Sequence, residues 1–466
     1  MIPRHSLPFD ARNIFSILLS SAPAMNSQDV EKAYADALGL RRVLLLPSVR
    51  AGTHMAILAA GGPGLAVTGP AYTCHTMHEA LALSGASIQL VDSAPGSFLM
   101  PPEGISAASE PGSVLVLSEV YGIPYDREML QKACEKGPRM RVFDMAMSIP
   151  SLERLGQLEA RDVALFSFGW GKPMFAGWGG IACFQDPALA DRVREIRDRW
   201  TIQESSGLRF RRGYSTLLRV AANQRYIYGL SHERHLYRLY KNMTSSRCEQ
   251  APSSSGDNAP AHFRNLGTPS YLKRGKGELI SPPLPVLSKA EGKGGYSIFC
   301  SPPLRGGDEG EGEPCAAGSS SDMTARTLPA EWTRPMTGLN RALAMHNLRN
   351  STHNAELRRL QAEIYHNNLV EPGIARGPGS NTLPQSHFPI RIPSGIRDAV
   401  CDYLRGRGID TSTLFSLPAG LGRDRYPNAA EAADEVMTLP LGMSITPDEV
   451  RMVSQCVKDG LQALGC

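Results

Sequence analysis

From Val43 to Phe184, the chain alternates between two patterns of apolar and polar residues. Short apolar runs bounded by glycine, proline or polar residues predict buried strands. Amphipathic stretches between them, such as Thr76–Leu83 and Arg127–Cys134, predict helices. This alternation is typical of an α/β domain with a mostly parallel sheet covered by helices on both faces. The predicted strands include Leu65–Val67, Ile88–Val91, Val114–Leu117, Val142–Asp144 and Val163–Ser167.

Three further helices are predicted around this region. The first, Asp29–Leu38, ends at Gly39, and the last, Leu217–Met243, is a longer helical stretch. The middle one, Asp186–Trp200, has an aspartate and alanines early and arginines late, which is the arrangement that the helix dipole favours.

The composition changes after this helical region. From about Thr244 to Thr327 the chain is rich in serine, glycine, proline and charge, and Ser281-Pro282-Pro283-Leu284 nearly repeats at Ser301-Pro302-Pro303-Leu304. Such a segment buries too little apolar surface to offset its ordering entropy, so we expect a disordered insertion over 244–330. A proline-rich segment that binds a partner is the alternative.

Regular patterns return at Glu331 and predict a smaller α+β domain. We therefore expect an N-terminal segment and large domain at 1–243, the insertion at 244–330, and a C-terminal domain at 331–466. The C-terminal elements are helices over Met336–Arg358, Arg397–Leu404 and Asp448–Leu464, and a half-exposed strand over His387–Ile392.

Composition excludes several classes of function. The net charge of +4, from 49 basic and 45 acidic residues, gives no basic excess for nucleic acid. Nine scattered cysteines without a C-x-x-C pair favour reduced thiols in the cytoplasm. No apolar run approaches the ~20 residues of a membrane span.

Two local patterns imitate other functions. The apolar stretch Ile14–Leu19 followed by Ala22-Pro23-Ala24 resembles a signal peptide, but it is short and follows Asp10. The histidines of His232-Glu233-Arg234-His235 are one residue too close for a helical zinc motif, so an amphipathic helix is expected there.

Lys172 is the candidate catalytic residue. It follows an apolar run in Ser167-Phe168-Gly169-Trp170-Gly171-Lys172 and precedes a second apolar run that begins at Ile181. Burial lowers the pKa of a lysine and frees its amine to form a Schiff base with a carbonyl compound or with pyridoxal phosphate (PLP). A surface lysine in a glycine-rich loop is the alternative.

Two upstream segments fit the same chemistry. Asp144 ends a predicted strand, where open α/β sheets bind ligands, and PLP needs an acid beside its pyridine nitrogen. The alternative for Asp144 is an N-cap. Gly52 and Thr53 precede an apolar helical stretch, where backbone N–H groups and a hydroxyl would bind a phosphate; helix capping by Thr53 is the alternative.

These segments, in this order, resemble the PLP-dependent sugar aminotransferases of the DegT–DnrJ–StrS group. The resemblance extends over the chain through five further motifs: Gly62-Pro63-Gly64, Pro70-Ala71-Tyr72-Thr73, Gly85-Ala86 with Val91-Asp92, Val120-Tyr121-Gly122-Ile123-Pro124, and Leu439-Pro440-Leu441 with Thr446-Pro447-Asp448-Glu449-Val450. It implies a fold-type-I large domain with a smaller C-terminal domain.

The resemblance also implies roles. Lys172 would hold PLP and move the substrate proton, Asp144 would pair with the pyridine nitrogen, and Gly52, Thr53 and Ser167 would bind the phosphate. The substrates would be an amino donor such as glutamate and a nucleotide-linked keto-sugar, used to make amino sugars or surface polysaccharides. Family members are homodimers with shared active sites.

Several positions depart from the family pattern. Met147 stands where the family has a cofactor-contacting glutamine, and Cys74 where an aromatic residue stacks on the ring. Tyr72 or His75 would replace that aromatic residue, and the sequence does not choose between them. Thr333 stands where a neighbouring subunit's asparagine contacts the phosphate.

Three alternatives accompany this interpretation. Sugar dehydratases of the same group replace the lysine by histidine, so the retention of Lys172 argues against that reaction. A keto-cyclitol is an alternative acceptor. The departures at Cys74 and Met147 also fit a degenerate, non-catalytic protein of the same fold that acts as a binding partner.

Overall fold

The computed structural model describes most of the chain. The described residues are 1–4, 6–9, 17, 26–135, 137–224, 228, 286–289, 296–299, 328–370, 374–376, 386–418 and 420–465. The zinc-like pattern at 232–235 and most of the signal-like stretch lie outside them. Among these residues, no helix is both long enough and apolar enough to cross a bilayer.

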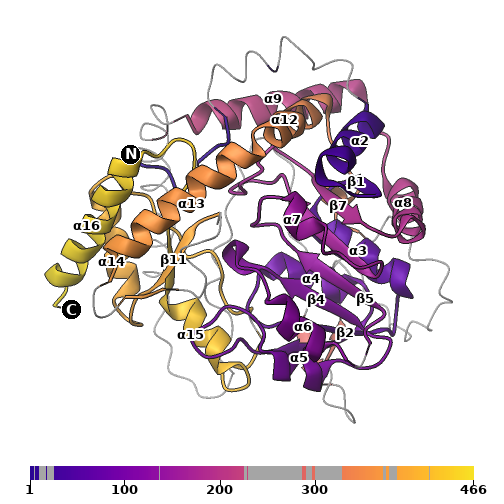
Figure 1. The fold of residues 1–466 in the computed structure, drawn as a ribbon, viewed down its shortest axis with the longest axis horizontal. Coiled ribbons are helices and arrows are strands. Elements are labelled where there is room, and N and C mark those ends of the chain that lie inside the picture. Colours follow the sequence, from indigo (N-terminus) through magenta and orange to yellow (C-terminus); the bar gives the residue numbers. More distant parts are fainter. Residues whose placement is uncertain are drawn as a thin grey trace, which may run out of the picture.

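A large sheet forms the centre of the molecule (Figure 1). Its strand order is β1-β7-β6-β5-β4-β2-β3, followed by β9 and β8 at one edge. The five strands from β6 to β3 run parallel, and β7 is antiparallel to both of its neighbours. This confirms the predicted mostly parallel sheet. The strands are β1 Arg42–Leu46, β2 Ala66–Pro70, β3 Ser87–Val91, β4 Val114–Ser118, β5 Met140–Asp144, β6 Asp162–Ser167 and β7 Gly180–Phe184.

Helices cover both faces of this sheet because successive strand residues point to opposite sides. On one face Val114 and Val116 pack with α3, α4 and α8. On the other, Leu115 and Leu117 pack with α2, α5, α6 and α12. The helices are α2 Ser27–Leu38, α3 Val49–Ala60, α4 His75–Leu83, α5 Pro102–Ala108, α6 Arg127–Ala133, α7 Leu152–Leu155, α8 Pro187–Trp200, α9 Ser206–Ala222 and α12 Gly338–Arg349.

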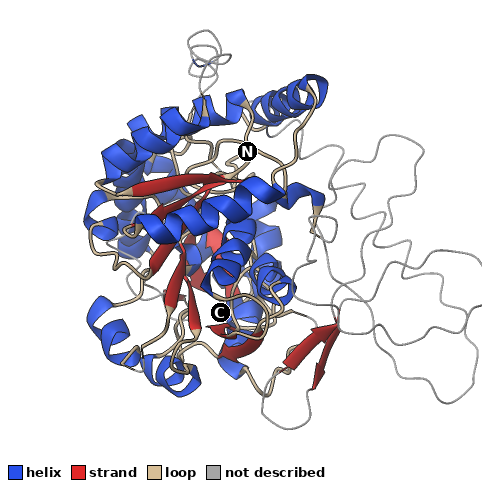
Figure 2. Cartoon of the chain, turned by 90° about the vertical axis from the view of Figure 1, so that its right-hand side faces the viewer, coloured by secondary structure: helices blue, strands red, loops and turns tan. Residues whose placement is uncertain are grey.

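The expected insertion contains regular structure in its described part. Strands β8 (Val286–Lys289) and β9 (Tyr296–Phe299) form an antiparallel hairpin. Strand β9 pairs with β3, so the hairpin extends the large sheet at that edge (Figure 2). The expectation of a largely disordered insertion stays a prediction for the rest of 244–330. The residues of 244–327 outside them are not described.

The C-terminal region forms a second layer. Antiparallel strands β10 (Ala375–Arg376), β11 (Phe388–Arg391) and β12 (Val436–Leu439) form a small sheet. Apolar residues of this sheet pack with α13, α14 and α16. The helices of this region are α13 Ser351–Asn368, α14 Arg397–Gly406, α15 Pro427–Glu435 and α16 Pro447–Ala463.

Two predicted helices differ from the observed ones. The helix expected from Leu217 begins earlier, as α9 at Ser206. The helix expected over Met336–Arg358 is divided into α12 and α13 at Asn350, whose backbone angles are φ −106° and ψ 7°. Asn350 closes α12 by donating its side-chain amide to the carbonyl of His346, a local bond that competes with helix continuation.

Candidate active site

The carboxyl ends of four strands meet at one edge of the large sheet. The register pairs Ser118 at the end of β4 with Asp144 at the end of β5. Gly180, the first residue of β7, pairs with Ser167 on one side and with Leu46 on the other. The ends of β1 and β6 therefore lie on either side of Gly180. This edge is where open α/β sheets bind ligands.

Asp144 is buried at this edge, with 8% of its surface exposed. Its Oδ1 accepts from the backbone N–H of Ala146 at 3.0 Å, and its Oδ2 accepts from Ser118 Oγ at 3.4 Å. Thr73 Oγ1 donates to Ser118 Oγ at 3.0 Å and continues this network. Asp144 closes a turn and is not a helix N-cap, since the next helix, α7, is capped by Ser151.

Burial raises the pKa of the Asp144 carboxyl. The positive charge of Lys172 opposes this effect, as do the hydrogen bonds from Ala146 and Ser118, but the net pKa stays above its ordinary value. The sequence-predicted pair is therefore close enough for the lysine charge to act on the aspartate. A raised pKa means that the folded protein lacks a full counter-charge for this carboxylate.

Lys172 lies in the loop that connects β6 and β7. The loop folds on itself: Phe168 N–H donates to Gly179 at 2.9 Å, and Ala176 N–H donates to Phe168 at 2.9 Å. Gly177 has φ +88°, and an added Cβ there would lie 2.4 Å from Thr216 Cγ2. This position therefore accepts no side chain, and the glycine lets α9 approach the loop.

Three buried asparagines hold the loop from the opposite side. Their side-chain amides donate to four consecutive loop carbonyls, those of residues 173 to 176. Asn354 donates to Pro173 at 2.9 Å, Asn347 donates to Met174 at 3.0 Å and to Phe175 at 2.8 Å, and Asn340 donates to Ala176 at 2.7 Å.

The sequence analysis missed these residues, which we term the asparagine ladder. The signal was available: Asn340, Asn347 and Asn354 are seven residues apart, which places them on one side of a helix. Buried amides on a helix need partners, so their regular spacing indicated a polar segment packed against α12 and α13.

Gly52 and Thr53 do not lie where the phosphate prediction needs them. Helix α3 begins at Val49, with Ser48 as its N-cap accepting from the N–H of Ala51 at 3.2 Å. The N–H of Gly52 is already bonded to the carbonyl of Ser48 at 3.0 Å, so these residues occupy the second turn. Neither of them is a cap. The first turn, which begins at Val49, presents the open N–H groups.

The requirement for glycine at position 52 is instead a matter of packing. An added Cβ would lie 2.4 Å from Leu46 Cδ1 and 3.2 Å from Leu165 Cδ2, so the glycine lets α3 lie directly on β1 and β6. Thr53 is fully buried, and its Oγ1 has no hydrogen-bond partner among the described residues.

Tyr72 does not face the site as a stacking residue. It is 1% exposed, so neither face of its ring is open to a cofactor. Its ring packs against Phe98 and Phe415, with centroids 6.1 Å and 5.7 Å away, and its hydroxyl bonds Tyr121 at 2.8 Å. This cluster joins the large sheet to the C-terminal layer.

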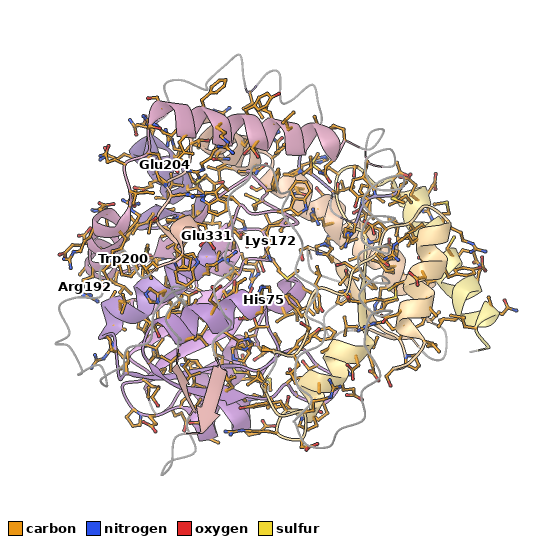
Figure 3. The ribbon with its side chains drawn as sticks, turned by 180° about the vertical axis from the view of Figure 1, so that it is seen from behind. His75, Lys172, Arg192, Trp200, Glu204 and Glu331 are labelled. Atoms are coloured by element: carbon orange, nitrogen blue, oxygen red, sulfur yellow. The ribbon has the colours of Figure 1, made fainter. Side chains whose placement is uncertain are left out.

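His75, the other candidate, is exposed at the start of α4. It lies with Lys172 and Glu331 in the central part of the view in Figure 3. The pKa of His75 is lowered, first because neighbouring protein atoms displace water from it, and second because the positive charge of Arg50 is near. These effects favour the neutral imidazole, and its ring is open to contact, which that of Tyr72 is not.

The other departing residues make contacts within the chain. Met147 is buried, and its sulfur accepts from the N–H of Tyr121 at 3.3 Å. Cys74 is the N-cap of α4, and its sulfur lies 3.1 Å from Thr76 Oγ1. Thr333 is buried, and its carbonyl accepts from the N–H of Ile202 at 3.0 Å.

The donor set suits an organic cofactor with a basic ring nitrogen and an anionic group. Asp144 supplies a buried acid, Lys172 an amine, Ser167 a half-buried hydroxyl, and the first turn of α3 backbone N–H groups. Within the described ranges, no group of three or more histidine, cysteine or acidic side chains could hold a metal ion.

The chain is similar to known proteins over most of its length. The sequence profile of the DegT/DnrJ/EryC1/StrS aminotransferase family matches residues 21–212 and 323–458. Sugar aminotransferase CalS13 from Micromonospora echinospora is 18% identical with a TM-score of 0.59, and the match covers 99% of this chain and 100% of that chain.

Two further solved structures match at similar levels. NtdA from Bacillus subtilis with bound cofactor PMP is 16% identical with a TM-score of 0.60, over 97% of this chain and 82% of that chain. DesI in the presence of its TDP-sugar product is 17% identical with a TM-score of 0.60, over 99% of this chain and 93% of that chain. At these identities the likeness shows the fold, which is the fold-type-I α/β fold.

Proposed function

Because this chain belongs to the DegT/DnrJ/EryC1/StrS aminotransferase family, we propose that it transfers an amino group from glutamate to a nucleotide-linked keto-sugar. It is an aminotransferase, and its cofactor is PLP. The keto-sugar is the acceptor most in keeping with its relatives, since CalS13 is a sugar aminotransferase and DesI is described with a TDP-sugar product. Formation of amino sugars for surface polysaccharides is a fitting use of such a product.

The observation that carries this proposal is the buried Asp144 under the influence of the Lys172 charge. A carboxyl whose pKa is raised by burial gains most from a cationic partner, and a protonated pyridine nitrogen is one. Asp144 would accept a hydrogen bond from that nitrogen and keep it protonated. Ser118 and Thr73 would hold the carboxylate in position through their hydroxyl network.

Bound PLP supplies an electron sink and carries the amino group between the two substrates. Lys172 Nζ would hold the cofactor covalently at rest and, once displaced by the donor, move the proton between substrate and cofactor carbon atoms. Ser167 Oγ and the N–H groups of the first turn of α3 would bind the phosphate. His75 would cover the ring on its exposed side.

Further parts of the proposal concern the whole molecule. We propose a homodimer in the cytoplasm, which is consistent with family resemblance and with the five described cysteines, all of which are free thiols. The division into 1–243, 244–330 and 331–466 remains a proposal. The unmatched residues 213–322 in the family comparison support an insertion between the two domains.

The visible absorption spectrum of the purified protein tests the proposal. We expect a yellow protein whose band falls when glutamate is added, and a Lys172→Ala variant that lacks the band. Nucleotide-linked keto-sugars and keto-cyclitols are then offered to the glutamate-treated protein. Return of the band with one acceptor class identifies the substrate, and a wild-type protein that stays colourless with added PLP refutes the proposed function.

A further inference from the structure

Arg50 occupies an unusual position beside this site. It is the second residue of α3, four positions after Leu46 at the end of β1, and its side chain is 31% exposed. A cation at a helix N-terminus faces the positive end of the helix dipole, which is unfavourable unless an anion is near. The nearest anions that the structure describes are the carboxylates of Glu79 and Glu331.

The two acidic neighbours of Arg50 bind it loosely. Its Nη1 lies 3.8 Å from Glu79 Oε2 and 4.0 Å from Glu331 Oε1, and the guanidinium makes no hydrogen bond to any residue that the structure describes. The contrast with Arg141 is clear, because Arg141 donates to both oxygens of Asp162, at 2.6 Å and 2.7 Å. The hydrogen-bond donors of Arg50 remain uncommitted.

The surroundings of Arg50 connect it to the active site. Its charge acts on His75, at the first residue of α4. The end of β1, which precedes α3, lies beside Gly180 of β7. Ser167 lies on the other side of Gly180, so one strand separates it from the end of β1.

We propose that Arg50 binds the phosphate or carboxylate oxygens of a ligand at the first turn of α3, exchanging its loose pairing with Glu79 and Glu331 for hydrogen bonds to the anion. Arginine donates in a planar fork that matches both anions. The source of the anion is the PLP phosphate or an anionic group of a substrate. This inference rests on the proposed function for its ligand.

The test is a set of equilibrium titrations of the full-length protein. Wild type, Arg50→Ala, Arg50→Lys and Arg50→Gln are titrated with PLP, with pyridoxal, which lacks the phosphate, with succinate and with inorganic phosphate. Arg192→Ala is the matched control, because Arg192 is an exposed arginine of the neighbouring helix α8 and lies at the periphery in Figure 3. Far-ultraviolet circular dichroism checks folding, and Arg50→Gln replaces Arg50→Ala where the latter fails to fold.

We expect Arg50→Ala to weaken PLP binding by about tenfold to a hundredfold, the effect of a lost hydrogen-bonded charge, with pyridoxal binding unchanged. Partial rescue by Arg50→Lys would support an anion contact. Unchanged PLP binding with weakened succinate binding would also support the inference and assign the anion to a substrate.

Two results would overturn the inference. One is equal weakening of PLP and pyridoxal, which would mean a structural role for Arg50. The other is an Arg50→Ala variant that gives the same affinities as the Arg192→Ala control in every titration, which would mean that Arg50 binds no anion. A wild type that binds neither PLP nor pyridoxal would refute the proposed function instead, and the inorganic phosphate titration would still decide whether Arg50 binds an anion.

Discussion

The two sides of the active site are held in opposite ways. On one side, the asparagine ladder occupies four consecutive carbonyls of the Lys172 loop with hydrogen bonds of 2.7–3.0 Å. On the other, Arg50 has two long ion pairs with described residues, at 3.8 Å and 4.0 Å, and His75 is exposed. A covalent bond needs a fixed lysine, whereas an incoming anion needs donors that are still available.

Asp144→Asn gives the largest effect and concerns the fixed side. We expect the transamination rate to fall by roughly a hundredfold or more, because an amide no longer stabilises a protonated ring nitrogen. Single-turnover kinetics with glutamate measure this loss. An unchanged rate would remove Asp144 from the mechanism.

Asp144→Asn is expected to raise the stability of the protein, although it lowers the transamination rate. The pKa of Asp144 is raised in the folded protein above its ordinary value of 3.8. Between the ordinary pKa and the raised pKa, the folded state therefore binds more protons than the unfolded state. Its contribution to stability is therefore lost as pH rises through that window. We expect cofactor-free Asp144→Asn to melt a few degrees above wild type at neutral pH, with the difference shrinking on acidification.

Asn347→Ala would break the ladder at its centre. It leaves the buried carbonyls of Met174 and Phe175 without their donor, so we expect a loss of about 2 kcal/mol in the free energy of unfolding. Denaturant unfolding measures the loss, and amide hydrogen exchange over the loop should accelerate.

Asn368→Ala is the matched control for the ladder. Among the residues that the structure describes, Asn368 donates to the carbonyl of Ile364 in its own helix, at 2.7 Å. Equal losses of stability in the two variants, with no change of exchange in the Lys172 loop, would show that the ladder does not fix the loop.

Tyr72→Phe separates the packed aromatic cluster from the site. It removes the buried hydroxyl contact with Tyr121, so we expect a loss of about 1 kcal/mol in stability. PLP affinity should stay within about twofold of wild type. A large loss of PLP affinity without a loss of stability would return Tyr72 to the site.

Glu79→Gln gives the smallest expected effect and concerns the loose side. Removing the nearer of the two carboxylates leaves Arg50 with less competition for an anion. We expect PLP binding to tighten by roughly twofold to fivefold, the size of an exposed ion-pair interaction. Weaker binding would mean that Glu79 orients Arg50 and does not compete with the ligand.

Local sequence patterns predicted the parts of the molecule that depend on neighbouring residues. The strand that ends at Asp144 and the glycine-rich loop around Lys172 were visible as runs of residue types, and so was the alternation that gives the sheet. The positions of Gly52 and Tyr72 depend on contacts from elsewhere: Leu165 packs on the glycine, and Phe415 of the C-terminal layer packs on the tyrosine.

The residues missed by the sequence analysis act across long separations. Asn340 and its acceptor Ala176 are 164 residues apart, and Asn354 and Pro173 are 181 apart. Spacing on a helix showed which side of it was polar but not what that side would meet. The sequence analysis placed the start of α3 too late, at Gly52 and Thr53. A local signal for the observed start was present, because Ser48 is a favoured N-cap residue and accepts from the N–H three positions later.

The asparagine ladder crosses the bend between two helices. Asn340 and Asn347 belong to α12, which packs on the large sheet, and Asn354 belongs to α13, which packs with α16 in the C-terminal layer. A change of angle at Asn350 would therefore pull on Pro173 while leaving Ala176 anchored. Lys172 is the residue next to Pro173, so we expect a change in the angle between α12 and α13 to be passed to the loop that carries Lys172.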